Sequence, residues 1–572
     1  MNIYDNIERA KKYIENRKFD DALELLRKSL TVKLDSNVKD EIFFEIGKIY
    51  FIKEKYKKSI FYLNKVQRED LKQFSYDLLL QIYDKLEQYN EVLNVFHQLD
   101  KNNVNVYILH SALNAAYKLE RVLEILSVIN IIRSNNIHDN LLEKLINTFY
   151  KSLSEKIQLL NVKNKREKVK DIYKKIYKHI PNNDVKFKNI VLNEYEIAMS
   201  KKTLKSYPRL IQIVITTKCN LNCIMCGKLN RDGKYELSDK RFRELLQLMP
   251  YLQRLILRGG EVFYYKYFDK ILEEAYKNNV EIEILTNGLL LNKSNIAKLI
   301  ETNVVLNFSI DSPIKETYES IRSGAKYNEL ISNILLLNKI EKEKKSQIKS
   351  FINMVVMRKN YKEIFDMIKF AKKYNFQGVT LNPIIGLYNE NCFSSKYKDN
   401  IMIIKELNKN RKKYELFAKA NGINLINKLP RKTIDFDKER VYSKKEKILE
   451  IKKFLINSNL INQKLISKKE INRFLDENCC ENFYYEKKIK FFCHAPWREI
   501  FLDEKSLFKP HCLCEKNVKI KNSKTYNNIL NLWNSKLMKK YRKKISEGRA
   551  YDVCNMGCLS NRYINYDNYR II

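Results

Sequence analysis

The chain has 572 residues, which is too long for one ordinary core, so we expect three or four domains. A hydrophobic content of 44% and an aromatic content of 12% exclude a wholly disordered protein. The formal net charge of +40 would suit nucleic acid or an anionic membrane. Its lysines are scattered through every segment, however, which favours a solvated basic surface over nucleic-acid binding.

The N-terminal residues lack the charged-then-apolar pattern of a signal peptide. No run of about 18 apolar residues would span a bilayer, so we predict a cytoplasmic protein without a membrane partner. In a reducing compartment, eleven cysteines more often bind metals or stay as buried thiols than form disulfides.

Residues 1–135 contain a repeated pattern. Its four units begin at Phe19, Tyr56, Tyr89 and Leu119, at intervals of 37, 33 and 30 residues. Three positions later, each unit has a small or branched residue: Ala22, Ser59, Val92 and Val122. Apolar residues then recur at helical spacing. The pattern resembles tetratricopeptide repeats. That resemblance implies an all-α helical-repeat solenoid, whose concave surface often binds peptides or partner proteins. The alternative is a helical cap that only stabilises the next domain.

A helical connector is expected over residues 136–206, and from Pro208 onward strands alternate with helices. The predicted strands are residues 210–216, 255–258, 280–285, 304–310, 351–357 and 378–382. The helices between them include residues 239–248, with Ser238 as N-cap, and residues 268–277. This alternation predicts a partial (β/α)6 barrel of the TIM type over residues 207–390, with functional groups at the C-terminal strand ends.

The remainder of the chain divides at about residue 490. Residues 391–490 form a Lys-rich, poorly patterned stretch that we interpret as a linker or insert. Residues 491–572 are expected to form a small α+β domain that contains cysteines. The predicted fold is therefore multidomain, with an all-α repeat region, a partial α/β barrel and a C-terminal cysteine-containing domain.

Three thiols lie within eight residues directly after the first predicted strand: Cys219, Cys223 and Cys226. Three thiolates bind three irons of a cubane and leave the fourth iron open to an outside ligand. This C-x3-C-x2-C spacing resembles the signature of the radical S-adenosylmethionine (SAM) superfamily, which implies a [4Fe–4S] cluster and SAM as cosubstrate. Met225 stands where the family often has an aromatic residue. A zinc knuckle would need a fourth nearby Cys or His, which the sequence lacks here.

The next strand ends carry further resemblance to this superfamily. Gly259, Gly260 and Glu261 resemble its Gly-Gly-Glu-Pro segment, which contacts the methionine amino group, although Val262 replaces the proline. At the next two strand ends, short polar side chains suit ribose hydroxyls and a methionine carboxylate: Asn287, Ser309 and Asp311. The stretch from Tyr318 to Gly324 resembles the family's fourth helix region, where Arg322 would be a site residue or a surface cation.

The C-terminal cysteines resemble a SPASM or twitch extension, which implies an auxiliary [4Fe–4S] cluster. Its expected ligands are Cys493, Cys554, Cys558 and either Cys512 or Cys514. A structural zinc site is the alternative, with His494 and His511 as possible ligands. We interpret Trp497 and Trp533 as core residues. The remaining cysteines are interpreted as structural or free thiols: Cys392, Cys479 and Cys480.

The resemblance implies an enzyme that cleaves SAM reductively and uses a 5′-deoxyadenosyl radical to abstract hydrogen. A low-potential donor such as flavodoxin or ferredoxin would supply the electron. The repeats favour a peptide or protein as substrate or partner. A small-molecule substrate, such as a sugar, with repeats that serve assembly is one alternative, and a non-catalytic cluster-containing binding protein is another. No catalytic residue is assigned.

Overall fold

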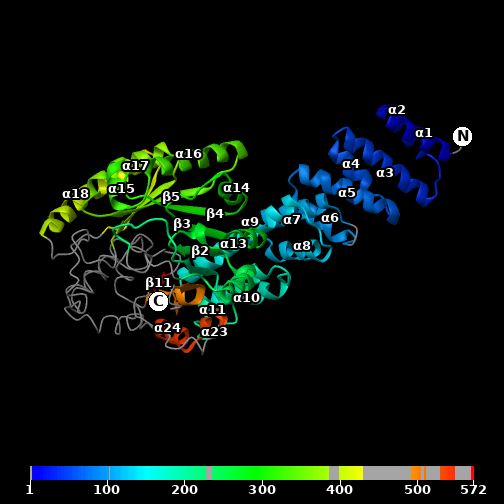
Figure 1. The fold of residues 1–572 in the computed structure, drawn as a ribbon. Helices are drawn as coiled ribbons and strands as arrows, with labels where there is room; N and C mark the ends of the chain where they lie inside the picture. Colours follow the sequence, from blue (N-terminus) through cyan, green and yellow to red (C-terminus); the bar gives the residue numbers. More distant parts are fainter. Residues whose placement is uncertain are drawn as a thin grey trace. The chain divides into compact units, whose positions relative to one another are not determined.

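The structure is a computed structural model that describes residues 3–101, 104–226, 235–384, 398–429, 491–503, 508–510, 528–547 and 569–571. The chain forms two compact units (Figure 1). The helical unit comprises residues 1–156 and 171–188, and the sheet unit comprises residues 157–170 and 189–572. Within the described ranges, no helix is both long and apolar enough to cross a membrane.

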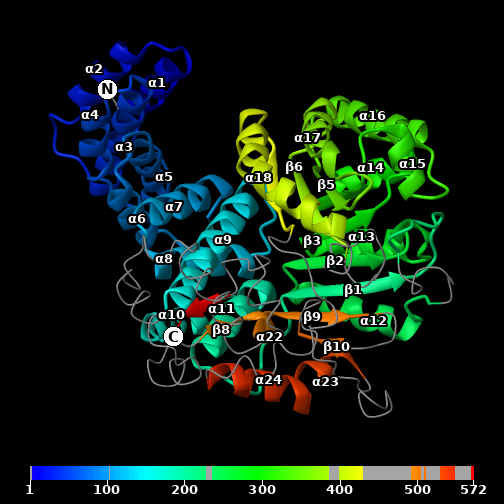
Figure 2. The ribbon, with the colours of Figure 1, turned by 90° about the vertical axis from the view of Figure 1, so that its left-hand side faces the viewer.

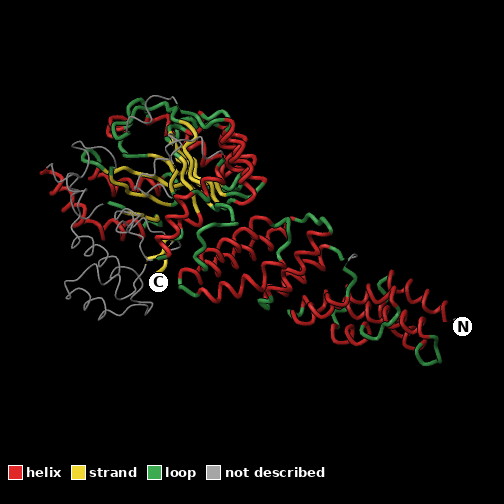
Figure 3. The backbone as a smooth tube through the Cα atoms, turned by 90° about the horizontal axis from the view of Figure 1, so that it is seen from below, coloured by secondary structure: helices red, strands yellow, loops and turns green. Residues whose placement is uncertain are grey.

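The helical unit begins with helical hairpins that follow one another from the N-terminus (Figure 3). Over residues 3–134 the structure has α1 (Ile3–Glu15), α2 (Phe19–Ser29), α3 (Ser36–Ile52), α4 (Tyr56–Leu63), α5 (Glu69–Lys85), α6 (Tyr89–Gln98), α7 (Val106–Lys118) and α8 (Val122–Ser134). Apolar residues at helical spacing are buried between the paired helices, as Ile7, Leu26 and Ile46 show. The structure therefore confirms the helical N-terminal region.

The same turn joins the two helices of each of these hairpins. Arg17, Glu54, Glu87 and Glu120 have φ between 52° and 58°, and each lies two residues before the second helix. The second helices begin at Phe19, Tyr56, Tyr89 and Val122, at intervals of 37, 33 and 33 residues. The predicted start of the fourth unit at Leu119 was therefore wrong by three residues, because the turn at Glu120 sets the helix start. Ile125, and not Val122, takes the buried position of Ala22.

The expected helical connector contains α9 (Asn140–Val162), α10 (Arg166–Ile176) and α11 (Val185–Ala198). Asn164, with φ of 54°, lies two residues before α10, so the turn between α9 and α10 repeats the geometry of the earlier hairpins. Part of this stretch belongs to each compact unit.

The sheet unit is built on a sheet of nine strands within the described residues, in the order β10-β9-β1-β2-β3-β4-β5-β6-β7. Their bounds are β1 (Leu210–Thr216), β2 (Arg254–Gly259), β3 (Glu281–Thr286), β4 (Val304–Ser309), β5 (Lys349–Val356), β6 (Gly378–Pro383), β7 (Asn424–Asn427), β9 (Glu499–Leu502) and β10 (Phe508–Lys509). All neighbouring pairs are parallel except β9 with β10. The six predicted strands and the parallel order of a partial barrel are thus confirmed.

Helices alternate with these strands in the chain and share a core with one face of the sheet. They are α12 (Asp239–Leu248), α13 (Phe268–Lys277), α14 (Lys293–Glu301), α15 (Lys315–Ile321), α16 (Tyr327–Lys344) and α17 (Ile364–Lys373). Ser238 caps α12 as predicted, because its Oγ accepts a hydrogen bond from the Arg241 amide. Ile213, Leu257 and Ile284 belong to this core, so the alternate side chains of each strand point to the opposite, concave face.

The sheet extends beyond the six predicted strands at both edges. Residues 391–490, expected as a linker or insert, contain α18 (Lys398–Ala420) and β7, which pairs with β6. At the other edge, β9 lies beside β1 and runs parallel to it (Figure 2). Each added strand covers an edge whose amide and carbonyl groups would otherwise be unpaired.

Residues 491–572, expected as a small domain that contains cysteines, are described in part. The described elements are β8 (Phe491–Cys493), α22 (Ala495–Arg498), α23 (Ile529–Trp533), α24 (Lys536–Ser546) and β11 (Tyr569–Ile571). They belong to the same compact unit as the barrel, and residues of β8, α22, α23 and α24 are part of its core. Trp497 and Trp533 are fully buried, as predicted for core residues, and their indole N–H groups donate to the Lys201 and Ser206 carbonyls.

Candidate functional site

The three clustered thiols lie on the loop that follows β1, at the C-terminal end of the sheet. Backbone hydrogen bonds hold this loop against the end of α15. The Asn222 amide donates to the Ser323 carbonyl at 2.8 Å, and the Ile224 amide donates to the Ile321 carbonyl at 2.9 Å. The loop that carries Cys219, Cys223 and Cys226, which we call the cysteine loop, is therefore fixed to the C-terminal end of α15.

Gly259 and Gly260 bring the end of β2 against the start of the cysteine loop. The Gly260 amide donates to the Thr216 carbonyl at 2.8 Å. A Cβ atom on Gly259, whose φ is +142°, would lie 2.0 Å from the Thr216 oxygen. A Cβ atom on Gly260 would lie 2.1 Å from the Lys218 oxygen. The two glycines thus admit a close backbone approach, which here is to residues 216–218 of the chain itself.

Glu261 is fully buried, and its carboxylate is held by the end of β3. Oε1 accepts from the Thr286 hydroxyl and Oε2 from the Asn287 amide, both at 2.8 Å. Asn287 in turn donates from Nδ2 to Asn220 Oδ1 at 2.7 Å, within the cysteine loop. Glu261 and Asn287, predicted as cosubstrate contacts, therefore also fix the ends of β2 and β3 to this loop. Sequence reasoning missed Asn220 because its partner lies 67 residues away.

Asp311 and Arg322 form a buried ion pair directly beside Cys223. Arg322 Nη2 lies 2.8 Å from Asp311 Oδ2, and Arg322 Nη1 is 3.7 Å from the Cys223 sulfur. Asp311 Oδ1 accepts from the Val355 amide at 2.7 Å, so its carboxylate is already engaged. The alternative that Arg322 is a surface cation was wrong, because its side chain is only 9% exposed. Its pairing with Asp311 explains this burial.

Met225 packs into a small apolar cluster below the cysteine loop. Met225 and Ile224 pack against three buried residues: Ile321 at the end of α15, Met357 directly after β5, and Ile384. An aliphatic thioether fills this space without the aromatic ring that is common at the position. The loop is thus anchored by apolar packing on one side and by hydrogen bonds on the other.

The electrostatic environment suits thiols that bind a cation. The pKa of Cys223 is raised to about 11, mainly by burial and also by Asp311 and the neighbouring Cys219 and Cys226, although Arg322 acts to lower it. Deprotonated thiols here need a compensating positive charge, which bound iron supplies. Among the described residues, no three His, Cys, Asp or Glu side chains converge on one metal ion. A cubane does not require this, since each thiolate binds a different iron. Three thiolates on one loop match the three protein ligands of a cubane whose fourth iron stays open.

Polar side chains form a row on the concave face beside this loop. Ser309, Asn353 and Thr380 are in register on β4, β5 and β6, close to the C-terminal strand ends. Hydroxyl and amide groups of this kind bind neutral polar ligands by hydrogen bonds. Among the residues predicted to bind the cosubstrate, Ser309 is the one that belongs to this row.

Comparison with known protein families identifies the superfamily that the region around the cysteine loop matches. Residues 213–371 match the sequence model of the radical SAM superfamily. The chain carries a radical SAM domain. The match begins in β1 and ends in α17, so it contains the cysteine loop, both glycines, Glu261, Asp311 and Arg322.

Relatives and solved structures resemble parts of the chain. It is 30% identical over 202 residues to GTP 3',8-cyclase of Synechocystis sp., which covers 33% of this chain and 60% of that protein. It is 31% identical over 193 residues to a probable GTP 3',8-cyclase of Methanothermobacter thermautotrophicus, covering 32% and 59%. The chain thus spans about 60% of the length of these curated relatives. Streptococcus suis SuiB bound to precursor peptide SuiA has a TM-score of 0.43 and 15% identity, covering 65% of this chain and 74% of that one.

The buried carboxylate of Glu261 should make the radical SAM domain sensitive to pH. Burial raises its pKa to about 7 from 4.5, although the Asn287 amide and Thr286 hydroxyl lower it. The folded state then binds this proton more tightly than the unfolded state. Stability of the cluster-free protein is therefore expected to fall as pH rises from about 4.5 to about 7, by at most about 1.4 kcal/mol per pH unit.

Urea unfolding at several pH values, followed by tryptophan fluorescence, measures this dependence. Glu261→Gln should flatten the pH dependence relative to the parent, because glutamine does not titrate. The exposed Glu273, which pairs with Lys270 and Lys277, provides the control substitution Glu273→Gln. Equal pH dependence in the parent and in Glu261→Gln would contradict the assignment.

Of the predicted auxiliary ligands, the structure describes Cys493, which is buried in β8. Cys512, Cys514, Cys554 and Cys558 lie outside the described residues. So do His511 and the remaining cysteines, Cys392, Cys479 and Cys480. His494 is fully buried beside Cys493, directly before α22. β11 pairs antiparallel with β8, with Tyr569 opposite Cys493, which returns the C-terminal end of the chain to this cysteine.

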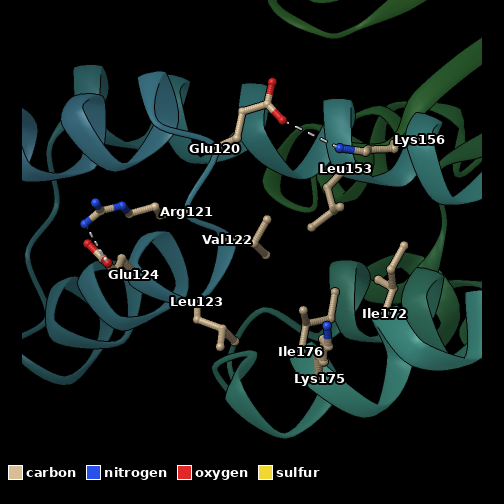
Figure 4. Close-up of a pocket in the computed structure, with 10 residues that line it drawn as sticks. All are labelled: Glu120, Arg121, Val122, Leu123, Glu124, Leu153, Lys156, Ile172, Lys175 and Ile176. Atoms are coloured by element: carbon tan, nitrogen blue, oxygen red, sulfur yellow. Dashed lines mark hydrogen bonds and ion pairs between the residues drawn. The ribbon is translucent and has the colours of Figure 1, made fainter. Parts of the chain in front are cut away.

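A hollow of about 360 Å³ lies in the helical unit between α8, α9 and α10 (Figure 4). Apolar side chains such as Val122, Leu153 and Ile172 line it. Charged side chains at its rim pair with each other, as Glu120 with Lys156 and Arg121 with Glu124 show. Its lining contains no cysteine or histidine.

Proposed function

We propose that this chain is a radical SAM enzyme in which Cys219, Cys223 and Cys226 bind a [4Fe–4S] cluster. The observation that carries the proposal is the cysteine loop itself, with three thiols at the C-terminal end of the first strand of a parallel sheet. Functional groups gather at this end in (β/α) barrels. The superfamily match over residues 213–371 supports the same conclusion.

Cys219, Cys223 and Cys226 would hold the cluster, which would supply the electron for reductive cleavage of SAM and so the 5′-deoxyadenosyl radical for hydrogen abstraction. The residues of the chain fix the geometry for this chemistry. Arg322 donates toward the Cys223 sulfur and places a positive charge beside it. Asn287 and the two glycines hold the cysteine loop against the strand ends.

The cosubstrate would lie at the strand ends beside this loop. We infer that Gly259, Gly260, Glu261, Asn287, Ser309 and Asp311 surround it. Ser309 would contact it directly. Glu261 and Asp311 are held by backbone amides of neighbouring strands, so their main contribution is to keep the strand ends in place.

The test uses protein reconstituted with iron and sulfide without oxygen, beside Cys219→Ala/Cys223→Ala/Cys226→Ala. We expect about eight irons in the parent and about four in the variant. Only the parent should form 5′-deoxyadenosine by reductive cleavage of SAM. Deoxyadenosine formation with dithionite, flavodoxin or ferredoxin identifies a competent electron donor. Iron content unchanged by the triple substitution would disprove the cluster assignment. A full, reducible cluster without deoxyadenosine would favour a non-catalytic binding protein.

We also propose one auxiliary [4Fe–4S] cluster, of the SPASM or twitch type, bound by Cys493, Cys554, Cys558 and Cys512 or Cys514. The pairing of β11 with β8 supports it, because it returns the chain from these late cysteines to Cys493. Cys554→Ala/Cys558→Ala should lose about four irons and keep the cluster of the cysteine loop. Zinc in place of this iron in elemental analysis would favour the structural zinc alternative.

We propose a peptide or protein as substrate, with the helical hairpins as a tetratricopeptide-like region that binds it. The repeated turn geometry supports a stacked-repeat architecture, which presents an extended binding surface. A small molecule is the second candidate, because relatives at 30% and 31% identity are named GTP 3',8-cyclase or probable GTP 3',8-cyclase. Deoxyadenosine release can be compared with GTP, with a peptide fraction and with a metabolite fraction. Stimulation by peptides alone is expected, and stimulation by GTP would favour the second candidate.

A further inference from the structure

Two arginines of β2 point to the concave face of the sheet. Leu255 and Leu257 belong to the core that the helices cover. Because side chains alternate along a strand, Arg254 and Arg258 point to the opposite, concave face. Arg258 lies near the C-terminal end of the strand, directly before the two glycines, and Arg254 begins the strand, about 13 Å away along it. The two arginines therefore share one face but lie at opposite ends of it.

The partners of the two arginines differ. Arg254 pairs with Glu281 on β3, and its Nη1 lies 3.8 Å from Glu283 Oε2. Arg258 has neither an ion pair nor a side-chain hydrogen bond in the part of the chain that the structure describes, although its Nε is enclosed. Enclosing a charged donor without an acceptor costs free energy. The C-terminal end of β2 therefore presents a guanidinium group whose hydrogen bonds are unsatisfied.

The surroundings of Arg258 supply no counter-charge within the described ranges. The carboxylates of Glu261 and Asp311 are already held by backbone amides of neighbouring strands. On the concave face, Val214 of β1 lies opposite Arg258 in register, and Ile256 precedes it on β2; both are buried. A charge beside apolar side chains attracts an opposite charge more strongly than it would in water, because the local dielectric constant is low. The site therefore favours an anion from outside the chain.

The polar row on β4, β5 and β6 lies on the same concave face as Arg258. The residues that precede Ser309, Asn353 and Thr380 on their strands belong to the helix-covered core, so these three side chains point away from it. Like Arg258, they have no side-chain hydrogen bond to any described residue. A ligand on this face would meet one positive charge on β2 and neutral donors and acceptors on the strands beyond β3.

We propose that Arg258 binds an anionic oxygen group of the substrate, a carboxylate or a phosphate, and that the polar row binds the neutral part next to it. The planar guanidinium group matches either anion with two parallel hydrogen bonds. The inference rests on the proposed function, because it takes the concave face beside the cysteine loop as the place where the substrate lies. Arg258 then determines specificity, since it favours an acidic substrate over a neutral analogue.

The test uses the full-length protein, reconstituted with iron and sulfide without oxygen, in equilibrium dialysis with SAM present. Two matched pairs of probes differ in the anionic group: a blocked Ala-Ala-Glu-Ala-Ala peptide with its Gln analogue, and ribose 5-phosphate with ribose. We expect the acidic member of at least one pair to bind about tenfold tighter than the neutral member. Preference in the peptide pair alone identifies a carboxylate, and preference in the sugar pair alone identifies a phosphate.

Substitutions separate a local site from the general positive charge of the chain. Arg258→Gln should abolish the preference, and Arg258→Lys should keep part of it, because the charge remains without the bidentate geometry. Arg254→Gln is the matched control on the same strand and face, and it should keep the preference, because Arg254 already pairs with glutamates. The urea midpoint of Arg258→Gln should not fall below that of the parent, since Arg258 has no ion pair to lose within the described residues.

Equal binding of acidic and neutral probes in both pairs would overturn the proposal, as would equal weakening by Arg258→Gln and Arg254→Gln. A loss of SAM affinity in Arg258→Gln that exceeds its loss of acidic-probe affinity would assign the anion to the SAM carboxylate instead. A lower urea midpoint would show a structural role for Arg258. Circular dichroism confirms that each variant is folded. Deoxyadenosine release by the parent, measured separately, distinguishes failure of the enzyme assignment from failure of this inference.

Discussion

Glu194→Gln is expected to lower the unfolding free energy of the sheet unit by about 3–5 kcal/mol. Glu194 is fully buried on α11, and its carboxylate pairs with two arginines that are themselves buried. Arg498 Nη2 lies 2.7 Å from Glu194 Oε1, and Arg209 Nη1 pairs with the same oxygen. Glutamine would remove the negative charge that both guanidinium groups share in the interior. Because Arg209 precedes β1 and Arg498 precedes β9, the N-terminal ends of these two paired strands would lose their shared anchor.

Tryptophan fluorescence during urea unfolding measures this effect on the sheet unit alone, since Trp497 and Trp533 are the two tryptophans of the chain. Glu273→Gln is the matched control, because Glu273 also lies between two cations but is 48% exposed, so its loss should cost much less stability than the loss of Glu194. Burial raises the pKa of Glu194, but Arg498 and Arg209 outweigh it and lower the pKa overall. The Glu194 carboxylate therefore stabilises the folded state fully above the ordinary glutamate pKa. This stabilisation is lost as the pH falls through the lowered pKa of the folded state. Equal destabilisation by both variants would contradict this account.

Arg322→Met should be the most damaging single change at the radical SAM site apart from loss of the cysteines. It leaves the Asp311 carboxylate buried without its partner, which should cost about 3–5 kcal/mol in the cluster-free protein. It also removes the donor to the Cys223 sulfur. We therefore expect the reconstituted variant to lose most of the iron that the cysteine loop binds.

The double variant Asp311→Asn/Arg322→Met separates these two effects. It removes both charges, so most of the stability should return, whereas the iron of the cysteine loop should stay low. Arg358→Met is the matched control, because Arg358 pairs at the surface with Asp399, which is 66% exposed. Full iron in the stable double variant would show that Arg322 acts only through folding.

The sequence predicted the six central strands almost residue by residue, because each is a short apolar run between polar turns. β1 and the helices α12 and α13 have the predicted bounds. It did not predict β7 or β9, which have four residues each and no distinctive alternation. β7 and β9 form because the edge strands β6 and β1 supply backbone hydrogen bonds to them. The local sequence of a short segment does not indicate that such an edge will lie beside it.

The repeat pattern was read correctly for three hairpins and misplaced in the fourth. Leu119 has the apolar character expected at the start of the unit, and periodicity alone favoured it. The left-handed turn residue Glu120 moves the helix start to Val122. A glutamate at this position in three of the four turns was the sequence signal that would have corrected the alignment.

At the candidate site, the sequence by itself determined the reactive groups: three thiols at cluster spacing, two adjacent glycines and a following carboxylate. Local spacing suffices there because the ligands lie on one loop. Only the tertiary structure decided how these groups are held, through Asn287 with Asn220, and Arg322 with Asp311 and Cys223. Asn287 and Asn220 are 67 residues apart, and Arg322 and Cys223 are 99 residues apart, and in each pair the two residues follow different strands. Their pairing depends on how the parallel sheet brings its C-terminal ends together, which no single segment of the sequence encodes.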